Sequence, residues 1–141
     1  MRKYTVVLLM LLSMPLFAQL EVIEDTKEVI GEVAPMGSMM GELVKDGDIY
    51  TLMYKDASYT KIMEIKSFSF KSADDFYNFM MDGMKEKRKD EQDITLDGIN
   101  FKIDFTRMMG VGSVRFYHHD RGVVGVSPYF TKKQLKKLFG K

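Results

Sequence analysis

Two adjacent histidines followed by an aspartate are the residues of this chain most suggestive of chemistry. The segment FYHHDRG, residues 116–122, contains both histidines, His118 and His119, and then Asp120. Imidazole and carboxylate groups serve as metal ligands and as general acids or bases. Neighbouring residues of a strand point to opposite faces, however, so two adjacent imidazoles cannot readily meet at one ion. We therefore expect a hairpin whose turn is Asp-Arg-Gly.

The alternation along this strand predicts different surroundings for the two histidines. If Phe116 and His118 face the core, His119 faces outward with Tyr117. Tyr117 and His119 are therefore candidate ligand-binding residues. A small hydrolase or lyase that uses His118 or His119 with a carboxylate such as Asp104 remains a further alternative, but no nucleophile can be named. We assign no catalytic residue and expect no enzymatic activity.

Clustered methionines form a second candidate site. Met36, Met39 and Met40 lie close together in the segment PMGSMMG. Thioethers are soft ligands that select Cu(I), so these residues, helped by His118, could hold copper or silver. Methionine also fills irregular cores and adaptable partner-binding surfaces, and we favour irregular packing. We accordingly expect no cofactor and keep the soft-metal site as the alternative.

Tyrosines of the first half are candidates for a binding platform. Tyr50 and Tyr54 share one face of a predicted strand with Leu52. That face is either part of the core or an aromatic surface for a peptide, glycan or protein. The sequence leaves both alternatives open, and we include Tyr50 and Tyr54 among the candidate ligand-binding residues.

The first eighteen residues have the composition of a secretory signal peptide. Arg2 and Lys3 precede an apolar run at 6–12, and small residues lead to an expected cleavage site after Ala18. We therefore expect a secreted or periplasmic protein, of bacterial type. No second apolar stretch of comparable length follows, so we expect no integral membrane segment in the mature chain.

Charge and cysteine content limit the classes of partner. The 141-residue chain has 21 basic and 20 acidic residues and no cysteine. Loss of the two basic residues of the leader leaves a near-neutral domain. Such a domain lacks the basic face that nucleic acid requires, so we exclude nucleic acid as a partner. An exported domain without disulfides depends on core packing alone.

Turn residues and periodicity predict a series of hairpins. Residues 28–33 read as a strand, and Asp-Gly pairs at 46–47 and 97–98 mark two hairpins. The segment 59–70 reads as one longer strand. Helical spacing from Ala73 to Met84 predicts a helix, with Ser72 and Asp75 resembling a capping box.

The last residues predict a second amphipathic helix. Thr131 and Gln134 match a capping box, and Phe130 is placed to pack on Leu135. Several lysines surround the apolar stripe of this helix. A basic amphipathic helix can dock on an anionic membrane, but the narrow stripe favours packing on the protein's own sheet.

These elements predict an α+β domain with one antiparallel sheet of about 7–8 strands and two amphipathic helices on one face. We expect an N-terminal arm or first strand at 19–35 and a single α+β domain at 36–141. Its halves, 36–84 and 94–141, are joined by a charged linker at 85–93 and are compatible with two β-hairpin, strand and helix pseudo-repeats.

The residue pattern contains no coherent catalytic constellation, and this determines the function class that we expect. We expect a small exported, non-catalytic binding or interaction module, whose partner is an unknown protein or cell-envelope ligand.

Overall fold

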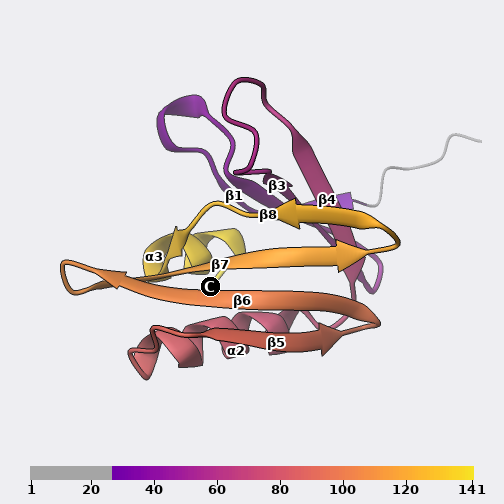
Figure 1. Cartoon of the computed structure of the whole chain (residues 1–141). Coiled ribbons are helices and arrows are strands. Elements are labelled where there is room, and N and C mark those ends of the chain that lie inside the picture. Colours follow the sequence, from indigo (N-terminus) through magenta and orange to yellow (C-terminus); the bar gives the residue numbers. More distant parts are fainter. Residues whose placement is uncertain (1–26) are drawn as a thin grey trace, which may run out of the picture.

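Two antiparallel sheets and two α-helices make up the computed structural model, which describes residues 27–141 (Figure 1). Sheet A contains β1 to β4 in that order, and sheet B contains β5 to β8, with the short β9 paired to β7. Every strand pairing is antiparallel. The predicted α+β class with antiparallel pairing is therefore confirmed.

The elements follow the chain as four strands, a helix, five strands and a helix. Sheet A is formed by β1 (Lys27–Val33), β2 (Gly41–Asp46), β3 (Ile49–Lys55) and β4 (Ile65–Phe70), with a short 3-10 helix, η1 (Pro35–Gly37), between β1 and β2. The helix α2 (Ala73–Lys85) comes next. Sheet B is formed by β5 (Glu91–Leu96), β6 (Ile99–Met108), β7 (Val111–Asp120), β8 (Val123–Val126) and β9 (Phe130–Thr131), and α3 (Lys132–Leu138) follows.

Tight turns with positive φ set the register of the hairpins. Gly47 has φ 60° between β2 and β3, and Asp97 and Gly98 have φ 49° and 80° between β5 and β6. Arg121 and Gly122 form the same kind of turn between β7 and β8. Paired positive φ values match the right-handed twist of the flanking strands. The hairpins predicted at both Asp-Gly pairs and at Asp-Arg-Gly are present.

The prediction of one continuous sheet is wrong. Strand β8 does not pair with β4, although the two approach each other through a hydrogen bond from Lys66 Nζ to the Val124 carbonyl at 2.9 Å. Side chains of sheet A lie against the backbone of β8, because a Cβ on Gly125 would strike the Tyr54 hydroxyl. The Val124 and Val126 carbonyls of β8 accept hydrogen bonds from Lys66 Nζ and from the Ala57 amide, and none from the backbone of β4.

The two helices also do not share one face of a single sheet. Helix α2 follows sheet A in sequence but packs on β6 and β7 of sheet B. Helix α3 follows sheet B in sequence but packs on β1 and β2 of sheet A, as well as on β9. The helices touch each other between the sheets. Each sheet is thus covered by the helix that comes from the other half of the chain.

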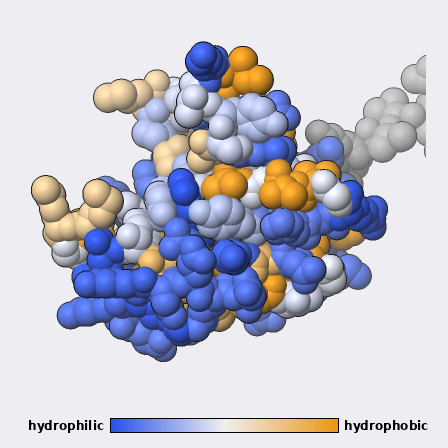
Figure 2. Space-filling view, in the orientation of Figure 1, coloured by the Kyte–Doolittle hydropathy of each residue, from blue (hydrophilic) through white to orange (hydrophobic). Residues whose placement is uncertain are grey.

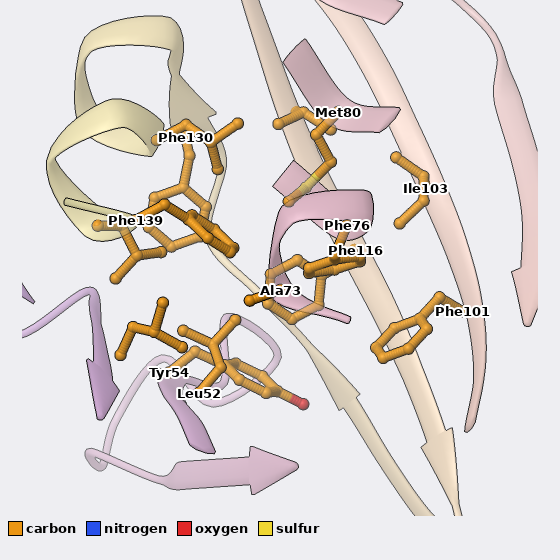
Figure 3. Close-up of a cluster of buried hydrophobic side chains, with 14 of the residues drawn as sticks. Leu52, Tyr54, Ala73, Phe76, Met80, Phe101, Ile103, Phe116, Phe130 and Phe139 are labelled. Atoms are coloured by element: carbon orange, nitrogen blue, oxygen red, sulfur yellow. The ribbon is translucent and has the colours of Figure 1, made fainter. Parts of the chain in front are cut away.

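The hydrophobic core lies between the sheets and the helices and is rich in aromatic rings (Figure 3). Phe76 of α2 packs against Phe68 and Phe70 of β4 and against Phe101 and Phe116 of sheet B, with ring centroids 5.0 to 6.0 Å apart. Such tilted and edge-to-face rings contribute attraction beyond their burial. Aromatic packing therefore joins both sheets around α2.

The helix starts differ from each other in their capping. Thr131 and Gln134 form the predicted capping box, with reciprocal hydrogen bonds of 3.3 and 3.0 Å. Ser72, in contrast, makes no side-chain cap, so the capping box predicted for α2 is wrong. The Asp97 carboxylate accepts hydrogen bonds from the Lys71 and Ser72 amides at 2.7 and 3.1 Å instead. An acidic side chain from a distant turn thus stabilises the start of α2.

Other predicted segments are shorter or longer than the pattern suggested. The strand expected at 59–70 is extended only from Ile65, and residues 59–64 form a bend. Strand β5 begins at Glu91, so the charged segment 85–93 includes the start of a strand. The expected signal peptide, with cleavage after Ala18, lies outside the described residues. Across residues 27–141 no helix has the length and apolar character needed to cross a membrane.

Candidate functional site

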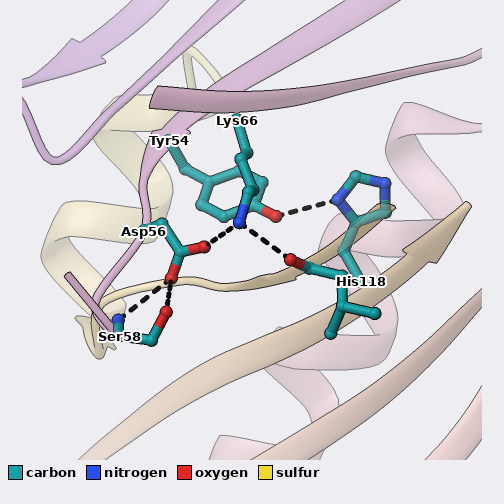
Figure 4. Close-up of polar contacts among 6 residues, drawn as sticks. Tyr54, Asp56, Ser58, Lys66 and His118 are labelled. Atoms are coloured by element: carbon teal, nitrogen blue, oxygen red, sulfur yellow. Dashed lines mark hydrogen bonds and ion pairs between the residues drawn. The ribbon is translucent and has the colours of Figure 1, made fainter. Parts of the chain in front are cut away.

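A buried tyrosine and a buried histidine from different sheets meet in the core. The Tyr54 hydroxyl lies 2.8 Å from Nδ1 of His118, and both side chains are almost wholly excluded from solvent (Figure 4). Tyr54 comes from β3 and His118 from β7. The rings of Phe68 and Phe101 lie 4.9 and 6.1 Å from the imidazole, centroid to centroid. His118 therefore faces the core, as the alternation along its strand predicted.

Burial keeps both members of this pair neutral. Desolvation lowers the pKa of His118 below its ordinary value; Asp120 opposes this shift, and His119 and Lys66 reinforce it. Desolvation also raises the pKa of Tyr54 well above its ordinary value, with a further contribution from Asp56. A neutral hydroxyl and a neutral imidazole form one hydrogen bond without a net buried charge.

A second buried group, Asp56, lies next to this pair at the end of β3. Its carboxylate is 2.5 Å from Lys66 Nζ and accepts hydrogen bonds from the Ser58 amide and hydroxyl at 2.9 and 2.6 Å. Burial works to raise the pKa of Asp56, but the hydrogen bonds from Lys66 and Ser58 outweigh it and hold that pKa below its ordinary value. Lys66 also bonds the Val124 carbonyl. The cluster therefore connects β3, β4 and β8.

This buried network has the features of a structural connection between the sheets. The His118 imidazole is enclosed by aromatic rings, and within the described chain its Nε2 has no hydrogen-bond partner. Catalysis by a histidine requires an orienting carboxylate on one nitrogen and a reacting group within reach of the other. Here the Nδ1 partner is a tyrosine hydroxyl that is itself fully buried.

The second candidate surface is the outer face of sheet B, on the side away from the core. It consists of the outward residues of β6, β7 and β8, and its central rows are Asn100 with His119 and Val124, and Lys102 with Tyr117 and Val126. The buried side chains of α2 and α3 belong to the core on the opposite side of the sheet. Figure 2 looks onto this face, which is mostly hydrophilic with a small apolar area over β8.

An ordered polar group borders this face. The Tyr129 hydroxyl donates to the Asp104 carboxylate at 2.8 Å, and the Arg115 guanidinium lies 4.0 Å from the centre of the Tyr129 ring. Burial and the hydrogen bond to Asp104 raise the pKa of Tyr129. A stacked arginine and a tyrosine fixed by a carboxylate form a rigid surface that loses little freedom on binding.

His119 lines two hollows on this face. One hollow of about 300 Å³ lies beside Thr95, Asn100 and Lys102. The other, of about 430 Å³, is strongly polar and includes Ser69 and Asp97. The face thus combines an exposed imidazole with amide, hydroxyl and charged groups.

The polar hollow does not contain an assembled catalytic triad. Ser69 is hydrogen-bonded to the Thr51 hydroxyl at 2.9 Å, and both oxygens of Asp97 accept bonds from the start of α2. No hydrogen bond joins His119 to either residue in the part of the chain that is described. A serine nucleophile needs a base within hydrogen-bond reach.

The four predicted ligand-binding residues lie in two separate places, two on an exposed sheet face and two at the core. Tyr117 and His119 lie together on the outer face of sheet B, as the alternation predicted. Tyr54 is fully buried, and Tyr50 is half-buried against Phe70 with Lys45 over its ring. The structure therefore brings together the second pair and places the first pair at the core.

The residues of the soft-metal alternative are also divided. Met36 is fully exposed on η1, whereas the Met40 sulfur accepts a hydrogen bond from Gln134 at 3.8 Å and packs against the core. Met39, between them, is half-buried, and His118 is enclosed by aromatic rings elsewhere in the core. Among residues 27–141, no three His, Asp or Glu side chains form a group able to hold a metal ion.

The sequence did not predict the side-chain contacts that build the buried network around Asp56 or the polar group around Tyr129. Asp56 and Ser58 form the local turn in which an aspartate accepts from the residue two positions later, a pattern visible in the sequence. No local pattern indicates that Lys66 reaches Asp56 or that Tyr129 reaches Asp104, because these contacts depend on how distant strands pack.

Comparison with known proteins finds no matching family model, no matching curated protein and no matching solved structure. The geometry of these two sites is therefore the basis for assigning a function.

Proposed function

We propose that this protein is a small exported, non-catalytic binding module whose binding surface is the outer face of sheet B. The observation that carries the proposal is the position of Tyr117 and His119, side by side in the two central rows of a sheet face that neither helix covers. Tyrosine and histidine offer an apolar ring and a polar tip, a combination enriched at binding surfaces. The partner is a protein or another ligand of the cell envelope.

The character of the surface supports a ligand that lies across the sheet. Val124 and Val126 of β8 supply apolar area, and Lys102 and Arg115 supply positive charge, next to the rings of Tyr117 and His119. Mixed apolar and polar composition of this kind is typical of non-obligate protein interfaces. Export with cleavage after Ala18 is part of the same proposal and depends on the residue pattern of the leader.

The alternatives receive less support from the contacts described above. A soft-metal site would need Met36, Met39 and Met40 to converge, yet Met40 is bonded to Gln134 and His118 is enclosed in the core. Metal analysis after copper exposure, with a Met36/Met39/Met40→Leu variant as control, tests this alternative; stoichiometric copper in the unsubstituted protein alone would support it. A hydrolase or lyase would need His119 to have an orienting carboxylate and a nucleophile within hydrogen-bond reach, and it is hydrogen-bonded to neither Asp97 nor Ser69 in the described chain.

The order of elements supports an additional proposal about the two halves. Each half has four antiparallel strands in sequence order and then a helix, with β9 inserted before α3. In this alignment Gly47, in the β2–β3 turn, corresponds to Gly110, in the β6–β7 turn, and both glycines have positive φ. Gly98 lies one turn earlier in its half, between β5 and β6. We infer that the halves are pseudo-repeats. This predicts that β1 to β4 with α2 superimpose on β5 to β8 with α3.

A photo-crosslinking amino acid tests the proposed surface directly. With benzoyl-phenylalanine at position 117, exposure to a bacterial cell-envelope extract is expected to give a discrete adduct, and His119→Ala should reduce its yield. The matched control carries the same amino acid at Ser67, an exposed position on the outer side of sheet A. Equal adducts from both positions, or none from position 117, would contradict the proposal.

A further inference from the structure

Two exposed methionines occupy turn positions that folding alone does not favour. Met36 in η1 has φ 56° and Met109 in the β6–β7 turn has φ 52°, and both side chains are fully exposed. Left-handed backbone is strained for a residue with a side chain, and asparagine, aspartate or glycine usually occupies it. A large apolar side chain at such a position gains nothing from burial in the folded domain. Each is followed by a glycine with positive φ, Gly37 or Gly110.

Further apolar side chains extend the projection at the β6–β7 turn. Met108 and Val111 flank Met109, and both are exposed. Figure 2 shows pale orange projections at this turn and at the segment between β1 and β2, both standing clear of the hydrophilic body. The two projections are convex. Anchor residues of protein interfaces, in contrast, usually lie in well-packed pockets near the centre of the interface.

Contacts place the two projections on either side of the beginning of α3. Gln134 of α3 donates to Met40, which follows the η1 segment, at 3.8 Å. Thr131, just before α3, pairs with Ser113 at the base of the β6–β7 turn. Figure 1 shows α3 between the two projecting segments. The methionine projections and the first residues of α3 therefore belong to one end of the molecule, which we call the methionine end.

The methionine end also carries lysines without ion-pair partners. Lys132 and Lys133 form the first turn of α3, where no acidic residue is present and where the helix dipole disfavours positive charge. Both are exposed, and within residues 27–141 neither is ion-paired. Their position, like that of the methionines, gives no evident benefit to folding.

A second group of positive charges lies on the other side of the β6–β7 turn. Met84, near the end of α2, lies beside Gly112 of β7, so the residues after α2 are close to this turn. Lys85, Lys87 and Lys89 are exposed there and, in the described chain, have no ion pair. The acidic neighbours Glu86 and Asp90 are both engaged by Arg88.

From this arrangement we propose that the methionine end docks the protein on the surface of a bilayer that contains anionic phospholipid. The apolar points enter the headgroup boundary, and the surrounding lysines attract the negative headgroups. Lysine is depleted at protein interfaces, whereas it is well suited to a diffuse anionic surface. Because the outer face of sheet B takes no part in this docking, the inference is separate from the proposed binding function.

The absence of cysteine from the chain gives a site-specific test. Met36→Cys and Met109→Cys variants each provide a single thiol for an environment-sensitive fluorophore. The matched control is Asp48→Cys, in the β2–β3 turn at the opposite end of sheet A from η1. The protein is purified as the exporting cell processes it and is mixed with vesicles of phosphatidylcholine and phosphatidylglycerol in equal amounts.

A blue shift with increased emission is expected at positions 36 and 109 but not at position 48. Lys132→Gln together with Lys133→Gln should weaken vesicle binding by roughly thirtyfold, since each lysine near an anionic surface contributes separately. Lys136→Gln with Lys137→Gln removes the same charge from the last turn of α3 and should have a smaller effect. No response at positions 36 and 109, or an equal response to phosphatidylcholine alone, would overturn the proposal. A response only to lipid-free envelope proteins would overturn it as well and would assign the methionine end to a protein partner.

Discussion

The hydroxyl of Tyr54 and Nδ1 of His118 are 2.8 Å apart, and their hydrogen bond connects sheet A to sheet B inside an aromatic core. Because both groups are buried, neither can exchange its partner for water without opening the space between the sheets.

Loss of the Tyr54 hydroxyl is therefore expected to cost stability. Tyr54→Phe keeps the ring but leaves Nδ1 of His118 unpaired, which should lower the free energy of unfolding by about 1 to 3 kcal/mol. Urea denaturation followed by circular dichroism measures the change. Tyr59→Phe removes a hydroxyl from a more exposed ring and should have little effect. Equal stability of Tyr54→Phe and the unsubstituted protein would show that the hydrogen bond contributes nothing.

Stability should also fall in mildly acidic solution. Burial lowers the pKa of His118 below its ordinary value of 6.5, so the folded imidazole stays neutral where the unfolded one takes up a proton. Above about pH 6.5 both states are neutral and the contribution is constant. As the pH falls below that value, the unfolded state binds more protons, and the free energy of unfolding decreases until the folded pKa is reached. His118→Gln should flatten this part of the profile, and a variant that keeps the full slope would refute the assignment.

The ion pair between Asp56 and Lys66 should be sensitive to loss of one member. Lys66→Met leaves the buried Asp56 carboxylate with only its Ser58 donors and removes the bond to Val124, which should cost about 3 kcal/mol. Lys102→Met, at the exposed pair with Glu91, is the control and should cost much less. Thermal unfolding of both variants makes the comparison.

The close approach of Tyr54 to β8 predicts that position 125 accepts only glycine. A methyl group at Gly125 would collide with the Tyr54 hydroxyl, so Gly125→Ala should destabilise the protein by about 1 to 3 kcal/mol. Gly112→Ala is the matched strand control, because the nearest atom there belongs to the flexible Arg107 side chain at 3.3 Å. A smaller loss at Gly125 than at Gly112 would be inconsistent with the packing described.

Substitutions at Asp97 and Ser72 test which of the two residues stabilises the start of α2. Asp97→Gly preserves a residue that accepts positive φ in the turn and removes the acceptor of two backbone amides, so we expect a loss of about 1 kcal/mol. Ser72→Ala removes only one weak contact to Asp97 at 3.2 Å and should cost less. Chemical denaturation of the two variants decides the order.

Local patterns in the sequence predicted the local parts of the fold. Asp-Gly pairs located hairpins, the apolar spacing located α2, and strand alternation placed His118 inward and His119 outward. These features depend on turn geometry and on a period of two or 3.6 residues, which are properties of the nearby chain.

The arrangement of the sheets and the partners in the buried site could not be predicted in the same way. Tyr54 packs against the backbone of Gly125, which is about seventy residues away in the chain, so this contact appears only when the two sheets pack together. The same reason applies to Asp97, whose carboxylate replaced the local cap expected from Ser72. Contacts of this kind arise from tertiary packing, which intrinsic propensities do not encode.

The exchange of helices between the two halves has a consequence for how the chain folds. Because α3 covers β1 and β2, roughly a hundred residues earlier, the first sheet has no cover for that part until the end of the chain is available. Contacts between such distant parts of a chain slow folding, because the chain must close a long loop before they form. In a newly made chain, the apolar side of β1 and β2 therefore stays without its helical cover until α3 has been synthesised.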